Sequence, residues 1–419
     1  MSTVKPEVGA VDRVHRSALY QKLDRWLDEH QEAFLRLLTA VCEVPAPPFK
    51  EERRAQWVAE AFRRAGLADV AIDGEGNVVA VYPAASSAHC RPALSDELLV
   101  ISAHLDTVFP DETGIRVRRE GDRLYAPGIG DNSSGVAALI FLAQGLWEAG
   151  WRPRCDVVFL ANTGEEGLGN LRGMRYFYQR GLGAQRPVPA ALVLDGRLGM
   201  VGTQAVGSRR LSVTYTGPGG HSWADFGRPS AVHALGRAIA AVAALEVPAE
   251  PKTTFNVGTV SGGTAVNAIA QRANMVVDLR SVDGEALKEL EQAVRQAIET
   301  AALQEPGIRV HVEVVGERPA GRLDPQHPLL GVVEAAAGQL GMKLQAIAAS
   351  TDANIPLSMG LPAVALGIRT GGGIHTYGEF VDIPSLWVGL RLALLALLGA
   401  ETWLADAGPF PTSRAVRGR

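Results

Sequence analysis

Apolar residues in the two outer parts of the chain form two repeating patterns. Short, nearly continuous apolar runs occupy residues 98–102, 156–161, 190–194 and 363–368. Runs of this length are typical of strands buried on both faces of a sheet. Apolar residues at helical spacing predict amphipathic helices over 17–39, 51–65, 328–340 and 383–404, and shorter strands are expected at 70–72, 77–82 and 343–348. Because strands alternate with helices, we expect an α/β fold whose mainly parallel sheet carries helices on both faces.

The middle of the chain has a different order of elements. Its pattern predicts strands at 210–216, 254–260, 272–280 and 309–315, with helices at 229–245 and 284–302. The order strand-helix-strand-strand-helix-strand is that of a ferredoxin-like α+β unit, and its size fits one small domain. A Gly-rich stretch at 199–207 marks the boundary. We therefore predict a main domain in two parts, 1–207 and 317–419, with an inserted domain at 208–316.

The composition narrows the classes of protein to which the chain can belong. Its 419 residues include 41 Lys and Arg against 45 Asp and Glu, a net charge of −4 with no extended basic patch. This balance favours neither nucleic acid nor an anionic membrane as a partner. Cys42, Cys90 and Cys155 are widely spaced and form no CxxC pair, which is typical of reduced thiols. Because no apolar leader is visible and the apolar stretch 390–400 is too short to span a bilayer, we expect a soluble, cytoplasmic protein.

Residues with metal-binding side chains follow several of the predicted strands. His104 and Asp106 come directly after the strand 98–102. In an extended chain their side chains point to the same face, so one could bind a metal ion while the other orients it. Open α/β sheets bind their ligands at the carboxyl ends of the strands. The other such residues are, in chain order, Asp131, Glu165, Glu166, Asp195 and His375.

Each of these residues also has an ordinary structural explanation. A His-x-Asp pair can simply hydrogen-bond at the end of a strand, Asp131 can cap the next helix, and adjacent carboxylates are usually solvated charges. Five separate segments nevertheless present a ligand-type side chain at a strand exit or in a strand-to-helix turn. Surface chance accounts for one or two such coincidences, so the recurrence favours a metal site.

Eight motifs occur in an order and spacing that point to one enzyme family. They are SAHLDTV, GIGDNSSG, NTGEEGLG, LDG, GGHS, VDLRS, STDAN and GGIHTYGEF. In these motifs, and over residues 35 to 399, the chain resembles the co-catalytic zinc hydrolases that include peptidase T, carboxypeptidase G, aminoacylase and the succinyl-diaminopimelate desuccinylases. The resemblance implies a zinc-hydrolase catalytic domain with an inserted lid and dimerisation domain, and a homodimer formed through that insertion.

The resemblance also implies a role for each ligand-type residue. It makes His104 and Asp195 the terminal ligands of one zinc ion. It makes Glu166 and His375 the terminal ligands of a second, with Asp131 bridging both. Two imidazoles and three carboxylates suit zinc and also accept cobalt or manganese. No ligand position of the family is missing, which argues against a binding protein that has kept the fold and lost the chemistry.

Three further residues are implied to be catalytic. Asp106 orients His104, and Glu165 is the general base that takes a proton from the metal-bound water and delivers it to the departing amine. His221, in GPGGHS, becomes a lid histidine that donates to the oxygen of the tetrahedral intermediate. In dimeric members this histidine reaches the active site of the partner subunit. From the residues alone, His221 is equally well a turn histidine with no chemistry.

The resemblance assigns substrate contacts to two more residues. Arg280 becomes a clamp on a substrate carboxylate, which a guanidinium can bind through two hydrogen bonds, although an exposed charge is the alternative. Asn267 becomes a hydrogen-bonding group for the substrate, although a plain turn amide explains it as well. Thr351 and Asp352 of STDAN are expected to hold the wall of the active site together.

The sequence therefore predicts a zinc-dependent metallopeptidase or amidohydrolase that acts on short peptides or N-acyl amino acids. Peptidases of the family tend to carry Asp at the position of Asp195 and deacylases Glu, which favours hydrolysis of peptides. We expect an unblocked di- or tripeptide to be cleaved at its amino-terminal bond, as by an aminopeptidase. The alternatives are an N-acyl-amino-acid deacylase and a carboxypeptidase, both of which would use the same site.

Overall fold

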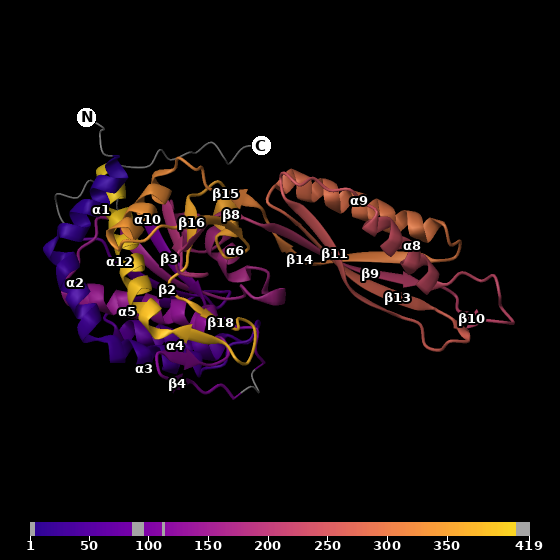
Figure 1. Cartoon of the computed structure of the whole chain (residues 1–419), viewed down its shortest axis with the longest axis horizontal. Helices are drawn as coiled ribbons and strands as arrows, with labels where there is room; N and C mark the ends of the chain where they lie inside the picture. The colour runs from indigo at the N-terminus through magenta and orange to yellow at the C-terminus, as the bar shows by residue number, and fades with distance from the viewer. Residues whose placement is uncertain (1–4, 86–95, 111–113, 408–419) are drawn as a thin grey trace. The chain divides into compact units, whose positions relative to one another are not determined.

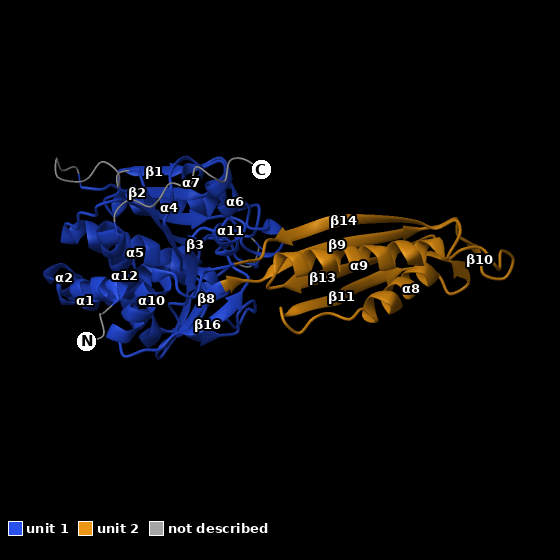
Figure 2. Ribbon diagram, turned by 90° about the horizontal axis from the view of Figure 1, so that it is seen from above, with its two compact units in different colours: residues 1–203, 322–419 blue, residues 204–321 orange. Residues whose placement is uncertain are grey.

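The computed structural model describes residues 5–85, 96–110 and 114–407, which form two compact units (Figures 1 and 2). Unit 1 comprises Met1–Thr203 and Arg322–Arg419, and unit 2 comprises Gln204–Gly321. The inserted unit thus begins and ends slightly outside the predicted segment 208–316. Of the three cysteines, Cys42 and Cys155 are buried free thiols, and Cys90 lies outside the described residues.

Unit 1 is built on a nine-stranded sheet with the order β1-β2-β6-β3-β7-β17-β8-β15, in which β16 also pairs with β8. The four adjacent strands β6, β3, β7 and β17 run parallel, as the apolar runs predicted, and are almost entirely buried. The bounds of the nine strands are β1 (Asp69–Ile72), β2 (Val78–Tyr82), β3 (Leu98–His104), β6 (Asp156–Asn162), β7 (Ala190–Val193), β8 (Met200–Ala205), β15 (Gly321–Arg322), β16 (Gln345–Ala349) and β17 (Ala363–Leu366).

The sheet is mixed, which corrects the expectation of a mainly parallel one. The pairs β1–β2, β2–β6 and β17–β8 are antiparallel. Connection length accounts for the pair β1–β2 and for the direction of β8: residues 73–77 join β1 to β2, and residues 194–199 join β7 to β8. A parallel return needs a crossover of a dozen or more residues, so both short connections reverse the direction of the chain.

The amino-terminal helices differ from the prediction. Instead of one helix over 17–39, the chain forms α2 (Ala18–Glu29) and α3 (Gln31–Cys42), which meet at His30. The backbone of His30 leaves the helical region (φ −113°, ψ 18°), and its ring Nδ1 lies 2.8 Å from the carbonyl oxygen of Trp26. The side chain thus occupies a carbonyl at the end of α2. A preceding helix, α1 (Pro6–Arg16), was not predicted.

The other helices of unit 1 include two that are almost wholly apolar. One is α5, which packs against α3, β3 and β6, and the other is α12, which packs against α1 and α10. With 25 residues, α12 is long and apolar enough to cross a membrane, contrary to the expectation from 390–400, but 72% of its most apolar window is buried inside the protein. That burial fits a core helix. The helices are α4 (Glu52–Arg64), α5 (Ser134–Ala149), α6 (Arg172–Gln179), α7 (Leu182–Gln185), α10 (Pro328–Gln339), α11 (Asn354–Ser358) and α12 (Ile383–Ala407).

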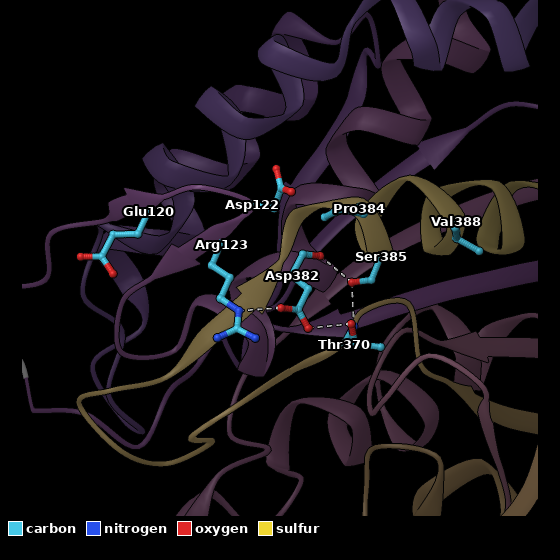
Figure 3. A pocket seen from close by; sticks show the side chains of 8 residues that line it. All are labelled: Glu120, Asp122, Arg123, Thr370, Asp382, Pro384, Ser385 and Val388. Carbon is cyan, nitrogen blue, oxygen red and sulfur yellow. Dashed lines mark hydrogen bonds and ion pairs between the residues drawn. The ribbon is translucent and has the colours of Figure 1, made fainter.

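A small second sheet in unit 1 joins two distant parts of the chain. It has the order β18-β19-β5-β4, with β4 (Arg118–Glu120), β5 (Arg123–Tyr125), β18 (Gly371–Gly372) and β19 (Phe380–Asp382). Arg123 Nε donates to Asp382 Oδ1 at 3.0 Å, and Thr370 Oγ1 donates to Asp382 Oδ2 at 3.0 Å (Figure 3). These residues line an open pocket that contains none of the predicted site residues.

Unit 2 has the elements β9 (Gly207–Thr216), α8 (Ala231–Ala243), β11 (Thr253–Gly262), β13 (Arg272–Ser281), α9 (Gly284–Leu303) and β14 (Arg309–Arg318). Their order along the chain is the one predicted, and the antiparallel sheet β11-β13-β9-β14 is that of a ferredoxin-like unit. Both helices cover one face of this sheet (Figure 2), and the core between them includes Val213, Tyr215 and Val277. A short ribbon pairs β10 (Gly220–His221) with β12 (Ala268–Ile269).

Candidate metal centre

Four of the five predicted metal ligands follow the central parallel strands of unit 1. His104 is the last residue of β3, Glu166 follows β6 and Asp195 follows β7, while His375 lies beyond β17 in the loop between β18 and β19. The carboxyl ends of parallel strands meet at one edge of a sheet, which is where this topology binds ligands. The fifth, Asp131, lies in the turn that leads into α5.

Asp131 is the centre of a cluster of imidazoles and carboxylates. Its Oδ1 lies 3.1 Å from His104 Nε2, and its Oδ2 lies 3.3 Å from His375 Nε2. The same His375 nitrogen lies 3.1 Å from Glu166 Oε1. Among the described residues, ligand atoms of His104, Asp131 and Glu166 lie within 4.8 Å of one another, close enough to share a metal ion. One carboxylate between two imidazoles is the arrangement that a bridging ligand requires.

Asp195 is placed beside this cluster by the residue before it. The carbonyl of Leu194 accepts a hydrogen bond from Asn132 Nδ2 at 2.8 Å, and Asn132 directly follows Asp131. Loss of solvation and the negative charge of Asp131 both raise the pKa of Asp195. Asp195 is not one of the compact group of three, but it interacts electrostatically with His104, which partly offsets this rise in its pKa.

Asp106 has a wider role than the orientation of His104. Its Oδ1 accepts the main-chain N–H of Glu165 at 3.0 Å, and its Oδ2 accepts that of Glu166 at 2.7 Å. His104 Nδ1 lies 3.0 Å from the main-chain oxygen of Asp106 but 3.6 Å from its carboxylate. The imidazole is therefore oriented mainly by the main chain of Asp106, while the carboxylate fixes the loop that carries both glutamates.

The electrostatics of the cluster match a cation site. A side-chain hydrogen bond to Asp131 raises the pKa of His375 to about 9, and burial raises the pKa of Glu166 to about 7. Burial opposes the ionisation of Asp131, yet its hydrogen bonds with His104 and His375 lower its pKa. Metals bind neutral imidazole and ionised carboxylate, so a divalent cation would displace these protons. The donor set, with nitrogen and oxygen atoms of His104, Asp131, Glu166 and His375 close together, fits such an ion.

Comparison with known proteins agrees with this geometry. Residues 100–398 match the family described as Peptidase family M20/M25/M40, which is well over half of the chain. The chain belongs to this family. It is therefore an enzyme, a zinc metallopeptidase or amidohydrolase.

The chain is similar in sequence or in fold to several characterised proteins. It is 28% identical over 325 residues to carboxypeptidase G2 of Pseudomonas sp., covering 72% of this chain and 74% of that one. It is 26% identical over 361 residues to acetylornithine deacetylase of Myxococcus xanthus, covering 82% and 89%. Aminopeptidase PepT of Bacillus cereus shares the fold with a TM-score of 0.73 at 21% identity, covering 88% and 98%.

Unit 2 of this M20/M25/M40 enzyme brings two of its three predicted site residues together. His221 on β10 pairs with Ala268 on β12, and the N–H of Ser222 donates to the carbonyl of Asn267 at 3.0 Å. His221 and Asn267 are both exposed. The His221 Nδ1 accepts the main-chain N–H groups of Trp223 at 3.2 Å and Ala224 at 3.3 Å. This leaves Nε2 as the nitrogen that carries a proton in the neutral ring.

Arg280 lies far from His221 within unit 2. It lies at the far end of β13 from Arg272, the β13 residue nearest the ribbon, which at about 3.3 Å per residue is roughly 26 Å away. Its Nε donates to Asp278 Oδ2 at 2.7 Å, and Arg210 Nε donates to the other oxygen of the same carboxylate at 3.3 Å. The predicted carboxylate clamp is thus already engaged by Asp278, which the sequence analysis did not consider.

Other buried polar residues of unit 1 lie close to the metal cluster. Asp352 is fully buried, and its Oδ2 accepts a hydrogen bond from Asn162 Nδ2 at 2.7 Å at the end of β6. The Oγ1 of Thr351 accepts the N–H of Ala353 at 3.2 Å. Sequence analysis missed Glu379 and Arg369, which contact the main chain around Asp131. Glu379 belongs to the motif GGIHTYGEF and Arg369 lies six residues before His375, but no residue pattern indicated a role for either of them.

Proposed function

We propose that this enzyme is a two-metal peptidase that hydrolyses the amide bond of short peptides, with di- and tripeptides cleaved at the amino-terminal bond. The observation that carries the proposal is the position of Asp131 between His104 and His375. A carboxylate placed in this way can bridge two cations. The PepT likeness, which concerns the fold, and the Asp at position 195 support a peptidase over other members of the family.

The cluster supplies a complete set of ligands for the proposed pair of ions. His104 and Asp195 would hold one zinc ion, Glu166 and His375 the other, and Asp131 both; cobalt or manganese also suits these donors. When bound, such a pair supplies an activated water and polarises the scissile carbonyl. His104 and Glu166 are buried, which shields their donor atoms from solvent, whereas the ring of His375 is half exposed.

Glu165 is the general base in this proposal. It lies next to Glu166 in the chain and is buried, and its main-chain N–H is fixed by Asp106. A carboxylate held there can take a proton from the attacking water and pass it to the departing amine. The hydrogen bond to Asp106 fixes the main chain from which this carboxylate extends.

His221 is the proposed oxyanion donor, supplied by the second subunit of a homodimer. The Nε2–H of its ring can donate to the developing negative oxygen, because Nδ1 is occupied by main-chain N–H groups. Asn267, held beside it by the ribbon, would add a second polar contact to the substrate.

A mixing experiment tests whether His221 acts across a dimer. His221→Ala and Glu165→Gln chains should each be nearly inactive, but one site of each heterodimer would be complete. Random assortment makes half of the dimers heterodimers, so restored turnover should approach about a quarter of the wild-type value. Replacing the Glu165→Gln chain with the double variant Glu165→Gln/His221→Ala is the matched control and should restore nothing. Absence of restoration in confirmed heterodimers would show that each chain works alone.

A second candidate function is deacylation of N-acyl amino acids. The likeness to acetylornithine deacetylase of Myxococcus xanthus over 82% of this chain favours it. The same water would then attack an acyl amide, so the metal cluster and Glu165 would keep their roles. Only recognition of the substrate differs, since a peptidase of this kind must accept a free α-amine.

A matched pair of substrates separates the two candidates. We expect the zinc-loaded enzyme to hydrolyse an unblocked tripeptide with a kcat/KM at least about tenfold higher than for the N-acetylated form of its first amino acid, a difference of about 1.4 kcal/mol. Amine release is measured for both. A higher kcat/KM for the acetylated amino acid would move the protein to the deacylases and reject the inference from Asp195.

A further inference from the structure

Glu379 makes an unusual set of contacts for a buried carboxylate. Its side chain is fully buried, and it accepts three main-chain N–H groups of one turn. Gly128 donates to Oε2 at 2.8 Å, Gly130 donates to Oε1 at 2.9 Å, and Asp131 donates to Oε1 at 2.8 Å. Converging main-chain N–H groups of this kind form a concave site for an anion. Glu379 fills that site permanently.

The turn around Gly130 is too tightly packed for a larger residue at that position. A Cβ atom added at Gly130 would lie 2.9 Å from both Glu379 Oε1 and Arg369 Nε. Arg369 is itself buried, and its Nε donates to the carbonyl of Gly130 at 3.0 Å. Glu379 therefore binds the N–H of both peptide groups that flank Gly130, and Arg369 binds the carbonyl oxygen of the second one. The residue that these hydrogen bonds position is the next one, Asp131.

Glu379 also belongs to the segment that carries His375. It lies four residues after His375, immediately before β19, and its main-chain oxygen accepts the N–H of Ala126 at 3.0 Å. In the small sheet, β19 pairs with β5, and the Arg123–Asp382 ion pair links the same two strands (Figure 3). The segment bearing His375 and the turn bearing Asp131 are thus joined through Glu379.

We propose that Glu379 is a positioning residue that couples Asp131 to His375, so that the bridging ligand and a terminal ligand of the metal site are held in place together. This inference rests on the metal site of the proposed function. Asp106 does the corresponding work on the other side, since it holds the main chain of Glu165 and Glu166. The turn that carries Asp131 and the loop that carries Glu165 and Glu166 are thus each fixed by a buried carboxylate that is not a proposed metal ligand.

The experiment is a titration of metal-free protein with Co²⁺, followed by its visible absorption and by calorimetry. Glu379→Gln preserves size but turns an NH2 group toward main-chain donors, so we expect the affinity for Co²⁺ to fall about 10–100-fold. Glu379→Asp keeps the charge at a shorter reach and should lie between the wild type and Glu379→Gln. Glu120→Gln, an exposed carboxylate of the same small sheet, is the matched control and should bind as the wild type does.

The outcomes separate this inference from the proposed function. Wild-type protein that binds no Co²⁺ would reject the metal site itself. Wild-type binding together with Glu379→Gln affinity within twofold of the wild-type value would reject only the role of Glu379. A lower melting temperature of the metal-free variant with unchanged affinity would mean a purely structural role and would also reject it. If Glu379→Gln does not fold, Glu379→Asp decides: its affinity must fall while the absorption of bound Co²⁺ shows altered coordination.

Discussion

Replacing Glu165 by Gln is expected to lower kcat by roughly 10²–10⁴-fold, the usual contribution of a general acid–base group, without unfolding the protein. Gln has the same shape and can be buried at the same position. The loop should stay in place because Asp106 binds its main-chain N–H groups and not the side chain of Glu165. What is lost is the ability to take a proton from water and return it to the departing amine.

Metal content and turnover have to be measured on the same samples of the Glu165→Gln variant. Two equivalents of zinc, an unchanged melting temperature and a large loss in kcat would assign the proton transfer to Glu165. Glu60→Gln, an exposed carboxylate on α4, is a suitable control and should retain full turnover. Turnover at the wild-type level would remove Glu165 from its role, and loss of zinc would attribute the effect to the cluster instead.

The fold was predictable wherever burial dominates the local sequence. The four apolar runs became the parallel strands β3, β6, β7 and β17, because a strand buried on both faces has to be apolar at every position. Strand direction at the sheet edge was not predictable from apolarity, since it depends on connection length. The break at His30 was also hidden, because α2 and α3 present apolar residues at the same spacing on both sides of it.

The site was predictable to the extent that its residues end strands. His104 and Glu166 lie together because the carboxyl ends of the neighbouring parallel strands β3 and β6 meet at one edge of the sheet, whereas His375 reaches them from the loop after β18. Glu379 could not be found in this way. Its partners are main-chain N–H groups about 250 positions earlier in the chain, and main-chain groups leave no trace in a residue pattern. Arg280 is a different case, because Asp278, two positions away on the same strand face, binds its guanidinium locally, and its contact with substrate stays a prediction.

Replacing Asp131 by Asn is expected to have the largest effect on the metal site itself. Asp131 contacts both imidazoles, so the substitution removes the one charge shared by the two halves of the cluster. A neutral amide cannot bridge two cations, and we expect zinc content to fall from two equivalents to one or fewer. Turnover should fall by roughly three orders of magnitude or more, since water activation and proton transfer then fail together. Asp122→Asn, an exposed carboxylate, is the control.

The dependence of the melting temperature on zinc tests, independently of catalysis, whether Asp131 binds the metal. Because bound metal stabilises only the folded state, zinc should raise the melting temperature of the wild type in a concentration-dependent way. In Asp131→Asn that rise should be nearly absent, whereas in His375→Ala a smaller rise should remain, since His104 still has a carboxylate partner. Equal rises in all three proteins would show that Asp131 does not bind the metal. If the rise is lost in His375→Ala as completely as in Asp131→Asn, the two ions bind only together. That behaviour is expected if Glu379 joins the segments that carry Asp131 and His375.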